Sequence, residues 1–370
     1  MKIGILTMHR VRNCGSFLQT FALSEALAKR NYKVEVIDYI YPNDNVELSI
    51  FDKPVTLSNA LKHLLPNICH RRWRLLSVQW QMIKWVYMLH RKLKLSQHTY
   101  YSSEELILNP PRYDYYLLGS DQVWNERFTK CDPIFFLTFA PQGTACLSFA
   151  SSAPNTNFSD LFLSCFSKYL KEFKCVSTRE KVSACYLSNY LSQRVESLLD
   201  PIFLLSKNEW NQVLRINDNQ RRYVLFFVLN YMGDVYSEAI NRLEEILINN
   251  EELEIYSNTN ILSHSSLAHI KGRKIKVLDD ILPKQFVQII ANAKYIITDS
   301  FHATAFGLLY EKKVIPVVSD IMNDVRIVDM CERIGTQDEN AFFYLDKQRL
   351  VIEKEKSILF LNYIFDEENG

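Results

Sequence analysis

A short polar segment between an apolar run and a helical pattern carries the strongest chemical signal in this chain. Residues 295–298 are typical of a buried strand, and the apolar positions after His302 recur at helical spacing. Asp299 and Ser300, which lie between them, are residue types that begin helices. We therefore expect His302 in the first helical turn, beside backbone N–H groups that attract anions. A histidine there can transfer protons near neutral pH, and a buried structural histidine is the alternative.

Three further charged residues follow or begin expected elements. Asp121 comes after an apolar run, where a carboxylate either orients a substrate hydroxyl or caps the next helix. Arg179 also follows an expected strand, and its guanidinium could grip a phosphate or carboxylate; the alternative is an ion pair with Glu180 or another acid. Arg326 lies where a helix should start, and a cation gains nothing there from the helix dipole. That misfit favours a ligand or a carboxylate partner for Arg326.

The loop at residues 13–16 joins the first expected strand to the first expected helix. It lacks the glycine spacing of a dinucleotide-binding loop, which argues against a nicotinamide or flavin site. Asn13 and Gly15 could direct backbone N–H groups toward a sugar. A tight turn into the helix is the simpler explanation.

Length and charge indicate two domains. The chain has 370 residues, which exceeds the size of about 250–300 residues at which single cores stop growing. Residues 1–205 hold 24 Lys plus Arg against 17 Asp plus Glu, whereas residues 206–370 hold 19 against 25. This reversal follows Asp200-Pro-Ile-Phe-Leu-Leu205 and precedes a polar stretch. We therefore expect domains at 1–205 and 206–370.

Strand patterns alternate with helical patterns in both halves. This alternation predicts an α/β fold with two doubly wound parallel sheets, which bind ligands beyond the carboxyl ends of their strands. The expected strands are 2–7, 33–39, 115–119, 145–150 and 175–178, then 223–229, 254–257, 276–278, 295–298 and 314–318; helices are expected at 16–30, 235–249 and 284–292.

Composition favours an ordinary cytoplasmic protein. With 48% hydrophobic and 23% charged residues it has a globular balance, and no apolar run approaches the roughly 18 residues of a membrane span. The first residues predict a strand rather than a signal peptide. Eight cysteines without a Cys-x-x-Cys pair predict reduced thiols and no zinc site.

Several motifs occur in the order found in one known family. Gly119-Ser-Asp-Gln-Val-Trp-Asn125 and Thr298-Asp-Ser-Phe-His302 resemble two blocks of the polysaccharide pyruvyl transferase family. Weaker similarities lie at Gly4-Ile-Leu-Thr7, at Asn13-Cys-Gly15 with Leu18-Gln19, at Ser177-Thr-Arg-Glu-Lys181, at Asp200-Pro201 and at Asn323-Asp-Val-Arg326. The resemblance covers roughly residues 3–335.

The resemblance implies transfer of a pyruvyl group from phosphoenolpyruvate to two hydroxyls of a saccharide. It also implies a glycosyltransferase B-type architecture, with two Rossmann-like domains facing a cleft, the acceptor on residues 1–205 and the donor on residues 206–370. No metal or cofactor is required. The roles it implies are catalysis for His302 and Asp121, donor binding for Arg179, Ser300, Phe301 and Arg326, and acceptor binding for Asn13, Gly15 and Gln19.

The chain departs from the family pattern at a few positions. Some members have Arg-Leu where this chain has Ser300-Phe301, so one charge that could bind the donor is absent. Ala303 and Ala153 stand where glycines are common. Each adds a methyl group beside a ligand path, which puts donor fit and acceptor choice in question.

Residues 53–103 are basic and are not explained by the family motifs. They contain nine Lys or Arg, no Asp or Glu, and the tryptophans 73, 80 and 85. A helical region of this kind could rest on the inner face of an anionic membrane and reach a lipid-linked acceptor. The alternative is a pair of helices that cover the first sheet with their Lys and Arg stems. No nucleic-acid-binding motif accompanies the charge.

Two other functions share these sequence features. A nucleotide-sugar glycosyltransferase would have the same two-domain architecture and a phosphate site. A noncatalytic saccharide-binding subunit of an assembly complex would bind sugar without turnover.

Overall fold

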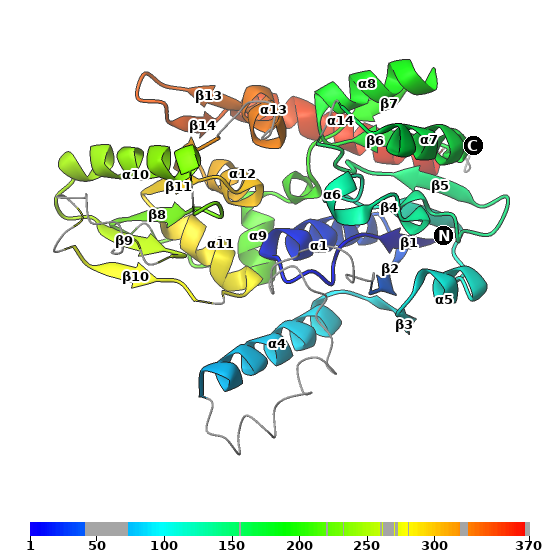
Figure 1. Cartoon of the computed structure of the whole chain (residues 1–370), viewed down its shortest axis with the longest axis horizontal. Coiled ribbons are helices and arrows are strands. Elements are labelled where there is room, and N and C mark those ends of the chain that lie inside the picture. The colour runs from blue at the N-terminus through cyan, green and yellow to red at the C-terminus, as the bar shows by residue number, and fades with distance from the viewer. Residues whose placement is uncertain are drawn as a thin grey trace. The chain divides into compact units, whose positions relative to one another are not determined.

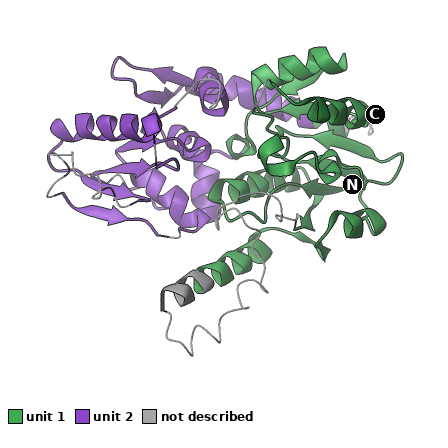
Figure 2. Cartoon of the chain, viewed as in Figure 1, with its two compact units in different colours: residues 1–204, 362–370 green, residues 205–361 purple. Residues whose placement is uncertain are grey.

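The computed structural model describes most of the chain. The described residues are 1–40, 73–154, 157–219, 221–231, 233–259, 261, 270, 273–279, 281–318 and 325–366, with only the backbone described for 73–79 and 366. The chain divides into two compact units, Met1–Leu204 with Asn362–Gly370 (unit 1) and Leu205–Leu361 (unit 2) (Figures 1 and 2). The expected domains 1–205 and 206–370 are contiguous, whereas the end of the chain belongs to unit 1.

The sheet of unit 1 is parallel and has the strand order β3-β2-β1-β4-β5. Two short parallel strands, β6 and β7, extend it because isolated bridges join Leu147 to Cys175 and Ser151 to Thr178. The strands are β1 Lys2–Leu6, β2 Lys33–Tyr39, β3 Leu95–Tyr100, β4 Tyr115–Leu118, β5 Ala145–Ser148, β6 Val176–Thr178 and β7 Val195–Ser197.

The central strands of unit 1 are apolar because both of their faces are covered. All four residues of β4, Tyr115–Leu118, are buried, as expected of a parallel strand between two layers of helices. In β1 a side chain at Gly4 would place its Cβ 2.3 Å from a ring atom of Tyr113, so only glycine fits there. The aromatic core cluster that includes Trp124, Phe136 and Phe166 lies on this sheet.

Helices of unit 1 connect these strands. They are α1 Cys14–Ala28, α4 Trp73–Lys92, α5 Ser103–Leu108, α6 Glu126–Thr129, α7 Asp160–Tyr169 and α8 Lys181–Leu191, with 3-10 turns at Pro133–Phe136, Leu170–Glu172 and Pro201–Leu204. Helix α1 is buried along most of its length and packs against the last of these turns. It is therefore a core helix whose polar side chains must find partners inside the protein.

The sheet of unit 2 is mixed, with the order β10-β9-β8-β11-β12-β14-β13. Its first five strands are parallel, and β14 and β13 are antiparallel at the edge. The strands are β8 Tyr223–Phe227, β9 Glu254–Ser257, β10 Ile275–Val277, β11 Tyr295–Thr298, β12 Lys313–Pro316, β13 Gly335–Gln337 and β14 Phe343–Leu345; the helices are α9 Lys207–Leu214, α10 Gly233–Ile248, α11 Pro283–Asn292, α12 Phe301–Leu309, α13 Val325–Ile334 and α14 Lys347–Asp366.

Both sheets confirm the predicted α/β class and doubly wound topology. The sheet of unit 2 differs from the prediction only at its edge, where β14 and β13 are antiparallel. Asp338 accepts hydrogen bonds from the N–H groups of Asn340 and Phe342 and so forms the turn between these two strands. The prediction of a helical region over residues 53–103 is wrong for residues 95–100, which form strand β3.

Each parallel sheet reverses its strand order once. The reversal lies between β1 and β4 in unit 1 and between β8 and β11 in unit 2. In open α/β sheets, ligands bind beyond the carboxyl ends of the strands at such a switch point. A ligand-binding site is therefore expected at the loops that follow β1, β4, β8 and β11.

Candidate functional site

Gln19 lies at the switch point of unit 1 and is fully buried. Its Nε2 carries two hydrogens and has three acceptors within reach: the backbone oxygen of Ser16 at 2.9 Å, Thr7 Oγ1 at 3.0 Å and Thr20 Oγ1 at 2.9 Å. Because a carbonyl oxygen only accepts, the bond to Ser16 fixes which end of the amide is nitrogen. Gln19 Oε1 faces away from these partners and accepts no hydrogen bond from any described residue.

Asp121 follows β4 on the other side of the switch point. Its backbone has φ +82°, a left-handed conformation that is uncommon outside glycine. Hydrogen bonds from the N–H groups of Val123 and Ser152 to its carbonyl oxygen, at 2.8 and 2.9 Å, hold this conformation. Oδ1 accepts from the N–H of Gln122 at 2.9 Å, and Oδ2 is buried without a hydrogen bond from the described residues. Strain of this kind persists only where the surroundings enforce it, and it is concentrated at functional sites.

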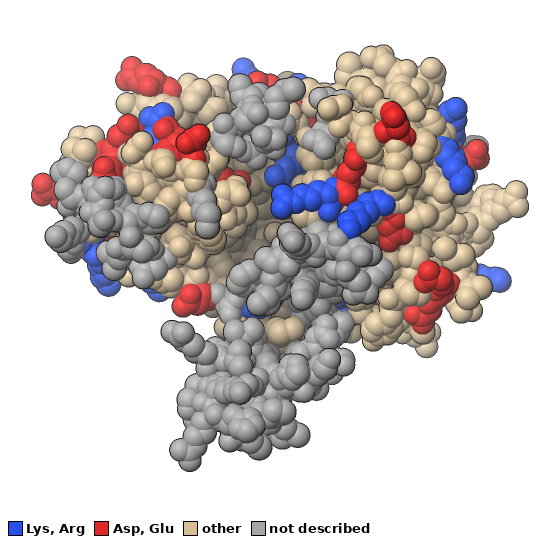
Figure 3. Space-filling model, in the orientation of Figure 1, with Lys and Arg blue, Asp and Glu red and all other residues tan. Residues whose placement is uncertain are grey.

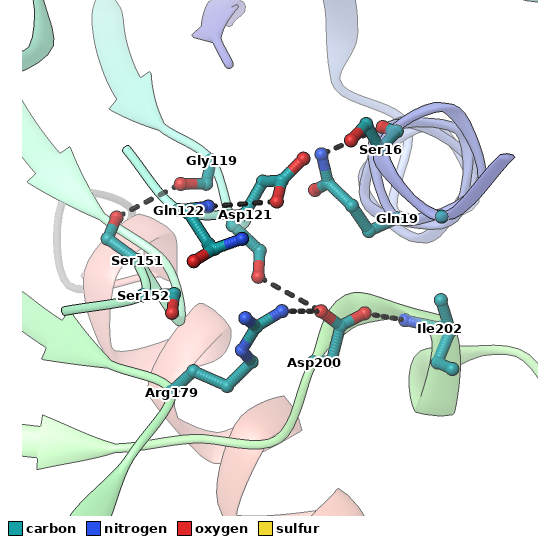
Figure 4. Close-up of polar contacts among 12 residues, drawn as sticks. Ser16, Gln19, Gly119, Asp121, Gln122, Ser151, Ser152, Arg179, Asp200 and Ile202 are labelled. Carbon is teal, nitrogen blue, oxygen red and sulfur yellow. Dashed lines mark hydrogen bonds and ion pairs between the residues drawn. The ribbon is translucent and has the colours of Figure 1, made fainter. Parts of the chain in front are cut away.

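Arg179 follows β6 and is buried in an ion-pair network. Its Nη1 donates to Asp200 at 2.8 Å (Figure 4). Its Nε donates to Glu180 at 3.3 Å. Burial opposes the charge of Arg179, but the carboxylates of Glu180, Asp200 and Asp121 outweigh it and raise the pKa of the guanidinium. The ion pair that the sequence left open as an alternative is therefore present.

The two acids that pair with Arg179 are themselves fully engaged. Glu180 also accepts from Ser152 Oγ at 2.6 Å and from the N–H of Ala153 at 3.1 Å. Asp200 also accepts from Ser120 Oγ at 3.2 Å and from the N–H of Ile202 at 3.1 Å. Each of these contacts of the two acids is with a hydrogen-bond donor. Together with Asp121, the cluster carries three carboxylates and one guanidinium, which makes this site unfavourable for an anion.

Asn13 and Gly15 serve the start of α1. Asn13 Oδ1 accepts from the N–H groups of Gly15 at 2.8 Å and Ser16 at 3.3 Å, so Asn13 is the N-cap of the helix. The N–H of Gly15, which we expected to face a sugar, is occupied by this cap. The simpler explanation, a tight turn into the helix, holds for these two residues.

Asp299 closes the switch point of unit 2. Its carboxylate accepts from the backbone N–H groups of Leu229 at 2.7 Å and Asn230 at 2.9 Å, and from Asn230 Nδ2 at 2.8 Å. It therefore ties the loop after β8 to the end of β11. The helix cap is Ser300, whose side chain accepts from the N–H of Ala303 at 3.4 Å.

His302 lies in the first turn of α12, as predicted, and is only 9% exposed. Its ring contacts that of Phe301 edge-on, with 5.1 Å between the centroids. Phe301 is buried as well, so its ring can fix the orientation of the imidazole. Arg326 is the second residue of α13 in the same unit and is half-buried.

Sequence reasoning missed a buried cluster after β1. Asp38 Oδ1 accepts from Arg10 Nε at 2.6 Å and contacts His9 Nε2 at 3.1 Å, and its Oδ2 accepts from Thr99 Oγ1 at 2.6 Å. Burial opposes ionisation, but the hydrogen bonds from His9 and Arg10 outweigh it and lower the pKa of Asp38 well below its usual range. The cluster anchors the loop between β1 and α1. The signal was the pair His9-Arg10, which two residues separate from the end of β1.

The basic segment 53–103 lies partly outside the described residues. Residues 53–72, among them Arg71 and Arg72, are not described, and neither are the side chains of Trp73 and Arg74. Trp85 is 2% exposed and packs inside unit 1, so its side chain cannot contact a membrane surface. Trp80 is 57% exposed. No described helix is both long and apolar enough to cross a bilayer.

Surface charge and the grouping of possible metal ligands bear on the kind of ligand that the described part of the chain could bind. On the face in Figure 3, basic and acidic side chains are interspersed among the described residues, with wide uncharged areas between them. No group of three or more His, Cys, Asp or Glu side chains that could hold a metal ion occurs among the described residues.

Two α/β units with polar side chains at their switch points define a ligand-binding protein of the doubly wound class. A family model, polysaccharide pyruvyl transferase, matches residues 13–321, most of the chain. The chain belongs to the polysaccharide pyruvyl transferase family. It is thus a transferase, and its family implies a saccharide acceptor. No curated protein sequence matches it.

Solved structures that the chain resembles weakly include two epimerases and a heptosyltransferase. A putative UDP-N-acetylglucosamine 2-epimerase from Listeria monocytogenes is 11% identical over 96% of this chain and 87% of its own, with a TM-score of 0.47. The UDP-GlcNAc 2-epimerase of Methanocaldococcus jannaschii is 11% identical over 98% and 100%, also with a TM-score of 0.47. The E. coli heptosyltransferase WaaC with ADP is 11% identical over 85% and 86%, with a TM-score of 0.40. Likenesses this weak do not bear on substrate.

Proposed function

We propose that this protein transfers the pyruvyl group of phosphoenolpyruvate to a saccharide and forms a cyclic ketal of a surface or extracellular polysaccharide. The observation that carries the proposal is the placement of His302. A histidine held by Phe301 in the first turn of α12 combines a proton-transfer group with a helix start suited to an anion. Family membership supports the same assignment.

The reaction makes defined demands on these groups. Protonation of the methylene carbon of phosphoenolpyruvate turns it into a methyl group, and the adjacent carbon accepts the oxygen of one sugar hydroxyl. The oxygen of a second hydroxyl then displaces phosphate from that carbon. Of the two hydroxyl protons, one balances the new methyl group and the other balances the released hydrogen phosphate. His302 is suited to carry a proton between oxygen and carbon, and the α12 start is suited to hold the donor.

Charge supports placing the donor with unit 2 rather than with the Arg179 cluster. Arg179 is outnumbered by carboxylates, so it cannot offer a trianionic donor a net positive environment. In this proposal Arg179 is a positioning residue that holds the ends of β4 and β6. Ser300, Phe301 and Arg326 remain the proposed donor-binding residues of unit 2.

The direct test is turnover. The full chain is incubated with phosphoenolpyruvate and a panel of saccharides, and released phosphate and a product mass increase are measured. His302→Gln should lower turnover by about 10²- to 10⁴-fold without a change in melting temperature. His98→Gln, at an exposed histidine of β3, is the matched control and should retain full activity.

The same assay separates the other functions. Binding of a nucleoside diphosphate without phosphoenolpyruvate turnover would favour a nucleotide-sugar glycosyltransferase. Saccharide binding with neither activity would favour a noncatalytic subunit. A His302→Gln variant with normal turnover, or with a much lower melting temperature, would make His302 a structural residue.

We propose a cytoplasmic location and, for residues 53–103, contact with the inner face of a membrane that carries the acceptor. Each basic residue near an anionic surface contributes about 1 kcal/mol, which salt screens. Co-sedimentation with anionic vesicles should therefore fall with salt and with replacement of Arg71, Arg72 and Arg74 by Gln. Equal recovery in the supernatant with neutral and anionic vesicles at low salt would remove this contact and favour a soluble acceptor.

A further inference from the structure

We propose that the outer face of helix α4 binds the headgroup layer of an anionic lipid bilayer, with the helix lying along the surface. The outer face is the stripe formed by Trp80, Lys84, Tyr87 and Arg91, all of which are exposed. This inference rests on the membrane contact proposed above for residues 53–103 and deepens it, because it names the side chains that make the contact.

Helix α4 has two opposite sides. At 3.6 residues per turn, the four positions of the outer face lie within about 60° of arc around the helix. The opposite side carries Trp85, Val86 and Leu89, which are 2%, 5% and 0% exposed. Trp80 and Tyr87, by contrast, are 57% and 62% exposed. The protein therefore covers one side of α4 and leaves the outer face accessible.

The outer face is positively charged. Its cations, Lys84 and Arg91, are seven residues apart, which corresponds to about 10 Å along the helix. Helix α4 contains no Asp or Glu at any position, so no carboxylate of the helix itself neutralises these cations. Arg91 Nη1 donates to Tyr87 Oη at 3.3 Å, which places the guanidinium beside the phenol group. A surface of negative charge complements this face.

The aromatic residues of the outer face suit the boundary between water and lipid. Trp and Tyr place an apolar ring in the headgroup layer and keep a polar N–H or O–H in contact with water. Trp80 and Tyr87 alternate with the two cations along the stripe. Ile83 and Met88, which are half-buried, flank the stripe on its two sides. A helix that lies flat on a bilayer would present these rings and cations to the same layer.

The small extent of the outer face favours lipid over a macromolecular partner. Its four side chains span about 16 Å of helix, whereas a stable protein interface takes about 20–30 residues from each partner. A nucleic-acid site would combine its basic residues with a recognition motif, and the sequence of α4 contains none. Lipid headgroups require no fixed partner geometry, so a few rings and cations suffice for a reversible contact.

Helix α4 is firmly joined to unit 1. The N–H of Leu93 donates to the carbonyl oxygen of Leu89 at 2.9 Å, and the N–H of Val36 donates to that of Lys94 at 2.8 Å, where the chain enters β3. The pKa of His90 is lowered by burial and by the nearby charge of Arg10, which belongs to the buried cluster around Asp38. Lipid bound to the outer face would therefore hold unit 1 itself at the surface.

Tryptophan fluorescence in the presence of vesicles tests this assignment. The full chain in a Trp73→Phe background is mixed with phosphatidylcholine vesicles, with and without phosphatidylserine, in the absence of phosphoenolpyruvate and saccharide. Trp85, Trp124 and Trp210 are at most 2% exposed, so a blue shift on binding reports Trp80. We expect that shift only with phosphatidylserine, and brominated acyl chains should quench the shifted emission. Trp80→Phe should abolish both effects.

Substitutions with matched controls measure the other side chains by co-sedimentation. Lys84→Glu and Arg91→Glu should each weaken binding to phosphatidylserine vesicles by about tenfold or more, because each replaces attraction with repulsion. Lys171→Glu makes the same change of charge at an exposed lysine of unit 1 outside α4 and should bind as the wild type does. Tyr87→Ala should weaken binding, whereas Tyr101→Ala, at a tyrosine that is 63% exposed, should not.

Several results would overturn the assignment. Trp80 emission that is already blue-shifted without vesicles would show that another part of the protein covers the outer face. Equal binding to neutral and anionic vesicles, or unchanged binding in both charge variants, would refute the role of the cations. Binding that falls only on replacement of Arg71, Arg72 and Arg74 would keep the wider membrane contact and remove α4 from it. Binding to polyglutamate but to no vesicle would indicate an acidic protein partner instead.

These measurements are independent of the proposed reaction. Vesicle binding through α4 without phosphoenolpyruvate turnover would refute pyruvyl transfer and leave the lipid contact in place. Turnover by a protein that binds no vesicle would do the reverse.

Discussion

Replacing Asp121 with Asn should make the ligand-free protein more stable. The change keeps the shape of the side chain, and Asn tolerates the left-handed backbone at φ +82° as well as Asp does. It turns one of the two carboxylate oxygens into an amide nitrogen, which is a hydrogen-bond donor, on a side chain that lies beside Gln19 in Figure 4. The substitution thus removes one negative charge and one unsatisfied buried acceptor from the loop after β4.

The expected gain follows from the buried oxygens. An unsatisfied buried acceptor costs about 1–3 kcal/mol, and a new amide hydrogen bond contributes about 1 kcal/mol. Loss of the attraction between Asp121 and Arg179 offsets part of this gain, because Asp121 helps to raise the pKa of that guanidinium. We expect a net increase of about 1–2 kcal/mol in the free energy of unfolding. For a domain of 150–250 residues this corresponds to a melting temperature higher by about 2–8 °C.

Differential scanning calorimetry of the wild type, Asp121→Asn and the control Asp114→Asn measures this difference. Asp114 accepts the N–H of Lys2 at 2.6 Å, so its replacement should be neutral or slightly destabilising. A melting temperature for Asp121→Asn at or below that of the wild type would show that Oδ2 is not a source of instability. The reasoning that this buried oxygen is an unsatisfied acceptor in the folded protein would then fail.

Three other substitutions probe the scaffold. Burial opposes ionisation of Asp38, but hydrogen bonds from His9 and Arg10 outweigh burial and lower the pKa of Asp38 in the folded protein below the unfolded value of about 3.9. The ionised carboxylate therefore contributes its full stabilisation above a pH of about 3.9, and this stabilisation is lost as the pH falls further. Asp38→Asn should therefore cost about 3–5 kcal/mol at pH 7 in urea titrations and flatten the acid limb; an unchanged limb would contradict this. Arg333→Met removes a buried guanidinium paired with two carboxylates and should cost about 3–5 kcal/mol by the same measurement, with exposed Arg194→Met as the neutral control. Gly4→Ala places a methyl group 2.3 Å from the Tyr113 ring and should cost about 1–3 kcal/mol by thermal unfolding, and a neutral result would show that the ring can move aside.

The sequence predicted the central strands well because burial on both faces leaves an uninterrupted apolar run. Strands β2, β9 and β11 have the predicted bounds, and β4 differs by one residue. Strand β3, Leu95–Tyr100, was missed because its residues are mostly polar and it is held by pairing with β2 rather than by its own pattern. Strands β7, β13 and β14 have three residues each, too few to show a period.

The sequence predicts those features of the candidate site that depend on residue type and on position within a single segment. The placement of His302 in a first helical turn and of Asp121 after a strand follows from local patterns. The partners of Arg179 do not, because Asp200 lies 21 residues later and meets it only through the pairing of β6 with β7. The same holds for Asp38, whose contacts with His9 and Arg10 require β1 and β2 to be neighbours.

The return of α14 to unit 1 constrains the order in which a ribosome can complete the two units. Phe365 near the end of this helix packs on Tyr32 and Tyr115, and Lys174 donates to the carbonyl oxygen of Ile364. Unit 1 therefore lacks part of its packing until residues after 361 have been synthesised, whereas every residue of unit 2 precedes them. During synthesis the first unit to begin is the last to be finished, and its exposed aromatic surface must be protected until then.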